Sequence, residues 1–279
     1  MVTLEYLLAF IEEDAPYGDI TTQSLTGGDS CQGTLVARQD GTIAGLEEAS
    51  MLFSHFRIDF IPKVSDGMDV SSGSRIALLK GPVAGMLLVE RTALNIIGRM
   101  SGIATRTRKI RSILTSHNVT CRIASTRKTA PGLRLLDKKA VALGGGEWHR
   151  LGLSDGILIK DNHLAFQSIE EAVGKAKGSN PYHKIEIEVE SPEEAFRAAK
   201  AGAAILLLDN MQPGKIRDTI RILDEEEIRG GLLIEVSGGI HEGNVLEYAI
   251  PGVDIISMGS LTHTVENFDI SLDIVPSEK

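Results

Sequence analysis

The sequence predicts an α/β protein whose C-terminal part is a parallel sheet covered by helices. Two observations carry this prediction. From residue 121 onward, short apolar runs alternate with segments of helical periodicity, a pattern typical of buried parallel strands joined by helices. The composition agrees, because 42% hydrophobic and 24% charged residues allow a large core. The 29 glycines and only 4% aromatic residues favour tight turns over an aromatic β-sandwich.

The region up to about residue 80 predicts an antiparallel sheet with one or two helices. The apolar spacing between Leu4 and Ile11 predicts a short amphipathic helix, and Gly33–Arg38 alternates as a strand does. Clusters of Gly and Ser at 27–30 and 71–74 indicate turns between these elements.

A long helix is predicted from Val83 to about Ser116, because apolar residues recur there every three or four positions. Gly98 and Gly102 lie inside it, where glycine lowers helix stability. They indicate either a kink or close helix packing, which could be between subunits. The basic cluster Arg106–Arg111 has helical spacing in an acidic protein, so we expect a solvated face rather than a nucleic-acid site.

The apolar runs after this helix are the predicted strands of an incomplete barrel. Helical segments such as Ser191–Ala201 and Pro213–Ile228 separate several of them. Only about six strand–helix units fit in the remaining ~150 residues, whereas a complete eightfold barrel takes roughly 250. The predicted strands are Cys121–Ser125, Gly156–Ile159, Ile185–Val189, Ala204–Leu208, Leu232–Val236 and Val253–Met258.

Charge and cysteine content exclude several classes of protein. Lys and Arg number 29 against 38 Asp and Glu, and the formal net charge of −9 disfavours a general nucleic-acid binder or a cationic membrane-surface protein. Cys31 and Cys121 have no neighbour at metal-ligand spacing and are expected to be reduced thiols. No apolar run approaches the roughly 20 residues of a membrane span, and Met1–Asp14 makes a poor signal peptide. We therefore expect a cytoplasmic protein without nucleic-acid or membrane partners.

Each predicted strand runs into polar, charged or glycine residues. A single Lys or Asp after a strand is usually a solvated loop residue, but repetition over six strands is a stronger signal. In barrel enzymes the C-terminal strand ends form the rim of the active site. The residues that predict such a rim here are Thr126-Arg127-Lys128, Lys160-Asp161-Asn162-His163, Glu186, Glu188, Glu190, Asp209-Asn210, Ser237-Gly238-Gly239 and Gly259-Ser260.

One set of candidate residues is basic. So many cations in one site would repel each other unless an anionic ligand neutralised them, and guanidinium groups bind planar carboxylates by paired hydrogen bonds. The alternative is a group of unrelated surface cations. We expect His149 to donate a hydrogen bond to an anion rather than to act as a base. The set consists of Arg127, Lys128, His149, Arg150 and Lys160, with Arg91 of the long helix as a possible addition.

A second set is acidic. Glu188 and Asp209 lie on adjacent predicted strands, where their carboxylates suit Mg²⁺ or ribose hydroxyls. The alternative is that they pair with neighbouring basic side chains. For Glu186 and Glu190 we prefer that second interpretation.

The glycines at the last two strand ends indicate a phosphate site. Ser237-Gly238-Gly239 and Gly259-Ser260 allow main-chain N–H groups to approach a phosphate, and late loops of barrels often bind one. Gly144–Gly146 is interpreted as a flexible turn that delivers His149 and Arg150. For His163 and His263, structural and functional roles remain equally open.

Longer motifs occur in a definite order along nearly the whole chain. They are Gly18-Asp-Ile-Thr-Thr22, Glu90-Arg-Thr-Ala-Leu-Asn95, Ser101-Gly-Ile-Ala-Thr105, Thr126-Arg-Lys-Thr-Ala-Pro-Gly-Leu-Arg134, Gly144-Gly-Gly-Glu-Trp-His-Arg150, Ile159-Lys-Asp-Asn-His163, Leu208-Asp-Asn-Met211, Ser237-Gly-Gly-Ile240 and Gly259-Ser-Leu-Thr-His263. Together they resemble the quinolinate phosphoribosyltransferases, also called nicotinate-nucleotide pyrophosphorylases (carboxylating).

The resemblance implies a subunit of two domains. Residues 1–108 would form an N-terminal α/β open sandwich completed by the C-terminal tail 267–279, and residues 109–266 an incomplete parallel α/β barrel that carries the active site. The resemblance also implies a homodimer with shared active sites, with a hexamer as the larger alternative. Arg91 would be the residue lent to the neighbouring site.

The activity that the resemblance implies is transfer of the phosphoribosyl group of 5-phosphoribosyl 1-pyrophosphate to quinolinate with decarboxylation. The products would be nicotinate mononucleotide, CO₂ and pyrophosphate, in NAD biosynthesis. Lys128, Glu188 and Asp209 would be catalytic, and the two carboxylates would hold Mg²⁺ directly or through water. The residues implied to bind quinolinate are Arg91, Arg127, His149, Arg150 and Lys160. Those implied to bind the phosphoribosyl phosphate are Ser237, Gly238, Gly239, Gly259, Ser260 and His263.

Two departures from the family pattern and two alternative functions stay open. Trp148 stands where the family often has Asn, and Lys139 where an aromatic residue is common; both could tune the site or pack differently.

One alternative function is that of a paralogue found near molybdate-transport functions, which acts on another aromatic acid. The intact Arg127, Arg150 and Lys160 argue against it. The other is a non-catalytic sensor of phosphate metabolites, against which the retained acidic residues argue.

Overall fold

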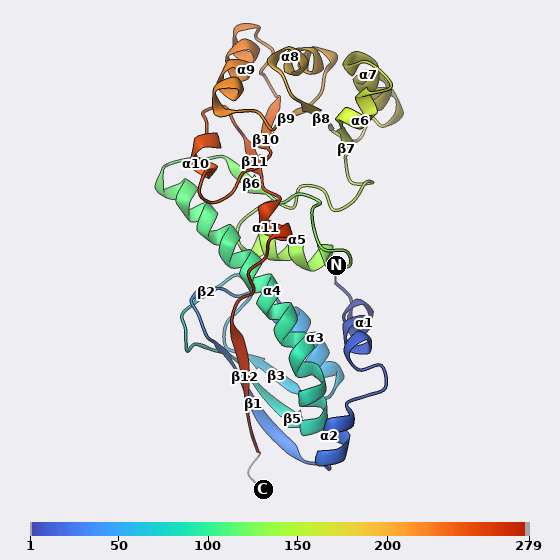
Figure 1. The fold of residues 1–279 in the computed structure, drawn as a ribbon, viewed down its shortest axis with the longest axis vertical. Helices are drawn as coiled ribbons and strands as arrows, with labels where there is room; N and C mark the ends of the chain where they lie inside the picture. The colour runs from blue at the N-terminus through green and yellow to red at the C-terminus, as the bar shows by residue number, and fades with distance from the viewer. Residues whose placement is uncertain (1, 277–279) are drawn as a thin grey trace. The chain divides into compact units, whose positions relative to one another are not determined.

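The computed structural model describes residues 2–276, and the chain forms two compact units (Figure 1). Unit 1 consists of Met1–Arg108, Ala130–Gly145 and Thr264–Lys279, and unit 2 of Lys109–Thr129 and Gly146–His263. These bounds differ from the expected ones mainly at Ala130–Gly145, which we expected in the barrel. The fold is of the predicted α/β class, with an antiparallel sheet in the first unit and a parallel sheet in the second.

Unit 1 is built on an antiparallel sheet with the strand order β12-β1-β5-β3. The C-terminal strand pairs along the full length of β1, from Cys31 opposite Pro276 to Ala37 opposite Ile270, and Figure 1 shows the two side by side. The C-terminal segment therefore completes the N-terminal unit. The strands are β1 (Ser30–Ala37), β3 (Asp59–Pro62), β5 (Arg75–Pro82) and β12 (Ile270–Pro276), and a separate pair joins β2 (Gly41–Thr42) to β4 (Asp69–Val70).

Helices of unit 1 begin at residues whose side chains accept hydrogen bonds from the first turn. The Thr3 hydroxyl accepts from the Tyr6 N–H, and the Asp19 carboxylate accepts from the N–H groups of Thr21 and Thr22, so Asp19 caps its helix. The helices are α1 (Leu4–Asp14), α2 (Ile20–Leu25), α3 (Leu46–His55), α4 (Val83–Ser116, which continues into unit 2) and α5 (Arg134–Leu143). The predicted helix from Val83 to Ser116 is confirmed.

The two glycines of α4 make room for another part of the same chain. The Phe268 N–H donates to the Gly98 carbonyl at 2.8 Å, so the segment before β12 lies against the helix. A Cβ atom at Gly102 would lie 2.0 Å from the Glu266 carbonyl oxygen, and one at Gly98 would lie 3.1 Å from the Phe268 carbonyl oxygen. Close packing within the chain therefore accounts for these glycines.

Ion pairs explain why α5 belongs to unit 1. The Arg99 guanidinium donates two hydrogen bonds to the fully buried Asp137, at 2.7 and 2.9 Å. Burial raises the pKa of Asp137, and the Arg99 pair opposes that shift. Lys139 donates to Glu47 and, at 2.7 Å, to the buried Glu48. Although burial lowers it, these hydrogen bonds leave the pKa of Lys139 above its usual value. Lys139 thus packs against α3.

The basic cluster Arg106–Arg111 is solvated only in part. Lys109 and Arg111 are exposed, whereas the half-buried Arg106 donates to the Thr264 carbonyl at 2.7 Å and the half-buried Arg108 to the Gly67 carbonyl at 2.8 Å. The expected turn is present at Gly144 and Gly145, and it packs closely, because a Cβ at Gly144 would lie 2.5 Å from the Ala104 carbonyl oxygen.

Unit 2 contains a parallel sheet with the strand order β6-β11-β10-β9-β8-β7. All six predicted strands are confirmed, and their central residues, such as Leu206, Ile234 and Ile256, are fully buried. Within residues 2–276 the edge strands β6 and β7 do not pair with each other, so the barrel is incomplete. The strands are β6 (Arg122–Ala124), β7 (Ile157–Ile159), β8 (Ile185–Val189), β9 (Ile205–Asp209), β10 (Leu233–Ser237) and β11 (Ile255–Ser257).

Helices follow most of these strands and cover the sheet from outside (Figure 1). Ser168 and Glu171 form a reciprocal cap at the start of α7, while Ser191 and Pro192 begin α8. The helices are α6 (Asp161–Leu164), α7 (Ile169–Ser179), α8 (Pro192–Ala201), α9 (Pro213–Glu225), α10 (Val245–Tyr248) and α11 (Ser260–His263). In the described part of the chain, no helix combines the length and apolar character needed to cross a membrane.

The packing at Gly102 leads to a stability prediction. We expect Gly102→Ala to lower the free energy of unfolding by at least about 2 kcal/mol, because the new methyl group meets a backbone carbonyl that cannot rotate away. Urea denaturation followed by circular dichroism measures the change. The matched control is Gly174→Ala in α7, where a Cβ meets nothing within 4 Å and should stabilise by roughly 0.5–1 kcal/mol. Equal stability of the two variants would contradict this packing.

Candidate active site

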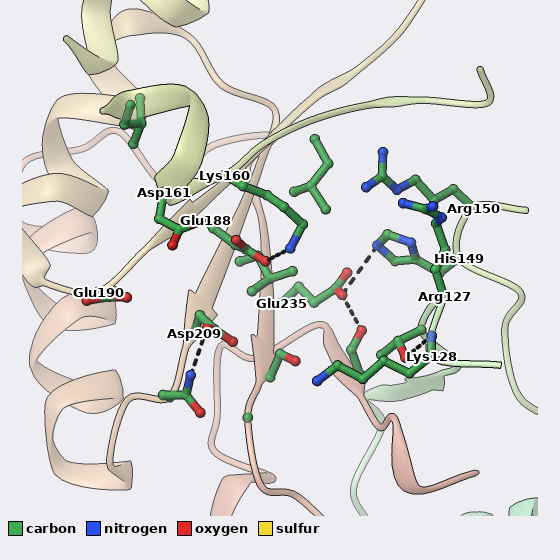
Figure 2. Close-up of a pocket in the computed structure, with 18 of the residues that line it drawn as sticks. Arg127, Lys128, His149, Arg150, Lys160, Asp161, Glu188, Glu190, Asp209 and Glu235 are labelled. Carbon is green, nitrogen blue, oxygen red and sulfur yellow. Dashed lines mark hydrogen bonds and ion pairs between the residues drawn. The ribbon is translucent and has the colours of Figure 1, made fainter. Parts of the chain in front are cut away.

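A cavity of about 810 Å³, here called the main cavity, lies at the carboxyl ends of the parallel strands (Figure 2). Every strand of the parallel sheet, or the loop that follows it, contributes to the wall. The main cavity therefore occupies the rim that the sequence predicts. Its polar lining residues are Thr126, Arg127, Lys128, His149, Arg150, Lys160, Asp161, Glu188, Glu190, Glu194, Asp209, Asn210, Glu235, Ser237 and Ser257.

Basic side chains gather on one side of the main cavity. Figure 2 shows Arg127, Lys128, His149 and Arg150 there, opposite Glu190 and Asp209. Arg127 and Lys128 follow β6, and His149 and Arg150 lie in the segment that leads to β7. A parallel bridge between Ala124 of β6 and Glu147 brings the two pairs together, although more than twenty residues separate them in the sequence.

The two arginines on this side lie close enough to affect each other. Burial, and next the positive charge of Arg127, lower the pKa of Arg150. Among residues 2–276, the buried Nε of Arg127 has no hydrogen-bond partner. Buried polar groups without partners are rare in folded proteins. An anionic ligand would neutralise the two guanidinium groups and provide the missing acceptor.

The acidic side chains come from neighbouring strands. Lys160, at the end of β7, donates a hydrogen bond to the Glu188 carboxylate of β8. Asp209 ends β9, and its Oδ2 accepts a hydrogen bond from the Asn210 side chain at 2.7 Å. Both carboxylates line the main cavity. Oxygen ligands of this kind fit Mg²⁺, which proteins commonly bind through one or two carboxylates together with substrate phosphates.

The loop after β10 requires glycine. Gly238 has a φ of +104°, and a Cβ there would lie 2.2 Å from Asn210 Oδ1 and 2.8 Å from the Asn210 nitrogen. Gly239 follows with a φ of +63°. Both glycines line the main cavity next to Ser237, so main-chain groups of this loop are accessible to a ligand.

His149 contacts two buried carboxylates. Its Nε2 lies 3.2 Å from Glu186 and 3.4 Å from Glu235, whose side chains are 7% and 1% exposed. The Ser257 hydroxyl also donates to Glu235. Our interpretation of Glu186 as a partner of a basic side chain is therefore confirmed. Glu190 instead lines the main cavity, with its main-chain N–H donating to Glu194 at 2.8 Å.

Sequence reasoning missed Glu235 and Ser257. Glu235 lies in the middle of β10, and Ser257 is the last residue of β11 but falls within the predicted strand Val253–Met258, where only the residues after the strand were candidates. The available signal was a charged residue within the apolar run Leu233-Ile-Glu-Val-Ser237, since a carboxylate in a buried strand requires a polar partner. Asn210, whose side chain donates a hydrogen bond to Asp209, was noted at the strand end, but the sequence analysis assigned it no function.

Comparison with known proteins identifies the family to which the chain belongs. The model of the quinolinate phosphoribosyl transferase N-terminal domain matches residues 19–101, and that of the C-terminal domain matches residues 103–273. The chain belongs to the quinolinate phosphoribosyltransferase family. Its fold agrees, because the crystal structure of NadC from Streptococcus pyogenes superposes with a TM-score of 0.91 at 34% identity, covering 98% of this chain and 96% of that one.

Curated quinolinate phosphoribosyltransferase relatives are similar over almost their whole length. A probable nicotinate-nucleotide pyrophosphorylase [carboxylating] of Methanothermobacter thermautotrophicus is 43% identical over 274 residues, which cover 97% of this chain and 98% of the relative. The human nicotinate-nucleotide pyrophosphorylase [carboxylating] is 34% identical over 280 residues, covering 99% and 93%.

Not every residue that the family resemblance implies lines the main cavity. Gly259, Ser260 and His263 are outside the lining, although a Cβ at Gly259 would lie 3.1 Å from both Lys128 and His263. Arg91 belongs to unit 1, where it is exposed on α4. Trp148 is 45% exposed and lines a second cavity, not the main cavity.

Proposed function

We propose that this chain is a nicotinate-nucleotide pyrophosphorylase (carboxylating), a pentosyltransferase of NAD biosynthesis. It transfers the phosphoribosyl group of 5-phosphoribosyl 1-pyrophosphate to quinolinate, and the products are nicotinate mononucleotide, CO₂ and pyrophosphate. The family and the names of its full-length relatives support this proposal. The structural observation that carries it is the pair of neighbouring guanidinium groups of Arg127 and Arg150, which suits a small dianion because the buried Nε of Arg127 has no hydrogen-bond partner among residues 2–276.

In this proposal the basic side of the main cavity binds the two carboxylates of quinolinate. Arg127 and Arg150 supply planar donor groups, and Lys160 and His149 add further donors. A dicarboxylate also relieves the repulsion between the guanidinium groups, so binding and charge neutralisation coincide. Arg91 of a neighbouring subunit is proposed to complete this set.

Lys128, Glu188 and Asp209 are proposed to hold phosphoribosyl pyrophosphate. The two carboxylates would hold Mg²⁺ directly or through water, and the ion would supply positive charge to the leaving pyrophosphate. The 5′-phosphate is assigned to the glycine loop after β10 and to the start of α11, next to Lys128. The residues of this phosphate site are Ser237, Gly238, Gly239, Gly259, Ser260 and His263.

The chemistry follows from where charge develops. As the pyrophosphate bond breaks, the anomeric carbon becomes cationic, and the carboxylates of Glu188 and Asp209 stabilise that charge. The quinolinate ring nitrogen donates its electron pair to this carbon and becomes positively charged. The adjacent carboxylate then leaves as CO₂, its bonding electrons remain on the ring carbon beside the cationic nitrogen, and a proton from water replaces it. No strong general base is required.

The decisive experiment mixes the purified protein with quinolinate, phosphoribosyl pyrophosphate and Mg²⁺. We expect nicotinate mononucleotide and CO₂ in equal amounts, and loss of both when EDTA removes the metal. Absence of product would overturn the proposal and favour the phosphate-metabolite sensor. Product from nicotinate or another aromatic acid, but not from quinolinate, would favour the paralogue instead.

A substitution at Arg127 separates the two substrates. We expect Arg127→Ala to weaken quinolinate binding by about 10- to 100-fold, because it removes charge-assisted hydrogen bonds to a carboxylate. Binding of phosphoribosyl pyrophosphate should change less than about twofold. Isothermal titration with each substrate measures both. Arg197→Ala, which breaks an exposed pair with Glu170 outside the main cavity, is the matched control. Equal loss of both substrates would contradict the assignment.

We further propose a homodimer whose subunits share their active sites, with the hexamer as a larger assembly. An arginine lent to a neighbour has to be accessible, and Arg91 is exposed on α4. Unit 1 also exposes large apolar side chains around α2: Tyr17 is 93% exposed, Ile20 75% and Leu25 79%. A surface of this kind is typical of a protein interface.

Shared sites predict complementation between two inactive variants. Arg91→Ala damages the site of the neighbour, whereas Asp209→Asn damages the site of its own subunit. Co-expressed with different tags, the two should yield hybrid dimers with one intact site, and the random mixture should recover about a quarter of wild-type activity. Each variant mixed with itself is the control. Purified hybrid dimers without activity would exclude the sharing of Arg91.

A cytoplasmic location is part of the proposal. Cys31 and Cys121 are both free and buried, and burial raises the pKa of each thiol. Such thiols suit a reducing compartment.

A further inference from the structure

The side chain of His149 lies between two cavities. A second cavity of about 700 Å³ is lined by residues at the amino ends of the parallel strands, among them Arg122, Lys184 and Ile205. His149 and Glu235 line both this second cavity and the main cavity. The imidazole is therefore not held by close packing on all sides, and its orientation has to come from hydrogen bonds and from the backbone.

Two features fix that orientation. The backbone of His149 has a φ of +55°, a left-handed conformation that costs about 1 kcal/mol or more for a residue with a side chain and persists only where the surroundings impose it. Its Nε2 lies within 3.2 Å of Glu186 and 3.4 Å of Glu235. Glu235 is itself held by the Ser257 hydroxyl. Chain direction and hydrogen bonds thus point the ring the same way (Figure 2).

The charges around the ring come from several elements. Glu186 of β8 and Glu235 of β10 are nearly fully buried carboxylates beside Nε2, whereas Arg150 and Arg127 bring positive charge from the same side of the main cavity. An opposite charge at such a distance strongly favours a protonated ring nitrogen. Two carboxylates at one nitrogen provide more negative charge than is needed to fix a tautomer. They also offset the neighbouring guanidinium groups.

We propose that Glu235 and Glu186 are positioning residues that keep the His149 imidazole doubly protonated and aimed at the aromatic acid. Nε2–H is shared between the two carboxylates, and the imidazolium donates a hydrogen bond to a carboxylate of the substrate. A neutral ring with its proton on Nε2 presents only an acceptor at the other nitrogen, which would repel an anion. This inference rests on the proposed function for the identity of the anion, but the state of the ring does not depend on it.

The first test observes the ring directly. In ligand-free protein labelled with ¹⁵N-histidine, His149→Ala identifies the His149 resonances among those of the 7 histidines. We expect both ring nitrogens of His149 to show imidazolium shifts at neutral pH, and a shift toward the neutral form in Glu235→Gln. A neutral ring in the wild-type protein would overturn the proposal. This measurement needs no substrate. An inactive wild-type protein would therefore contradict the proposed function but would leave the test of Glu235 valid.

The second test is a double-mutant cycle in the activity assay. Glu235→Gln keeps the shape of the side chain, and we expect it to raise KM for quinolinate about tenfold while kcat and KM for phosphoribosyl pyrophosphate change less than about twofold. In the His149→Ala background the same substitution should add less than about twofold. An undiminished effect in that background, or a common loss in all three constants, would show that Glu235 acts independently of His149.

Controls separate positioning from stability and from metal binding. Glu170→Gln removes one negative charge from the same unit at an exposed pair and should leave the constants unchanged. If circular dichroism shows that Glu235→Gln does not fold, Glu186→Gln replaces it in the same double-mutant cycle.

The ligand atoms of His149, Glu186 and Glu235 lie within 4.8 Å of one another, a spacing that also suits a metal ion. Stoichiometric metal in the purified wild-type protein that is lost in Glu235→Gln would overturn the assignment.

Discussion

Repulsion between like charges at the open end of the parallel sheet is the constraint on which the rest of the site depends. Arg127 follows β6, and Arg150 follows the segment at Glu147 that bridges to Ala124 of β6. Burial, and next the positive charge of Arg127, lower the pKa of Arg150. Both arginine side chains are half-buried, and the carboxylates of Glu186, Glu188 and Asp155 offset part of the repulsion at Arg150. A bound anion would offset more of it and would give the buried Nε of Arg127 an acceptor, so this side of the main cavity favours anionic ligands.

The carboxylates around the main cavity divide its cations into two kinds. Lys160 is paired with Glu188, and His149 with Glu186 and Glu235, so these side chains are held in place before any ligand arrives. The Nε of Arg127 receives no such partner in the described part of the chain. Side chains that are already paired provide orientation, and the Nε of Arg127 remains available to a ligand. The rigid strands that carry the carboxylates make this division possible.

Most of the helices and strands that depend on local hydrophobic periodicity could be predicted from the sequence. The six apolar strands, the long α4 helix and the rim of polar strand ends follow from periodicity and from the geometry of parallel sheets. The placement of α5 could not be predicted, because it depends on Lys139 reaching Glu48, 91 positions away in the sequence. Glu235 was missed for a related reason: whether a strand residue faces a cavity depends on how far the sheet closes, which periodicity does not reveal.

The strand β12 has a consequence for how the chain acquires its structure. The sheet of unit 1 places β1 between β5 and β12, a strand that follows all of unit 2 in the sequence. During synthesis β12 emerges after every element of unit 2, so β1 keeps an unprotected edge while unit 2 emerges. An exposed edge of this kind is a template for pairing with other chains. The N-terminal unit therefore remains prone to aggregation until β12 has emerged and paired with β1.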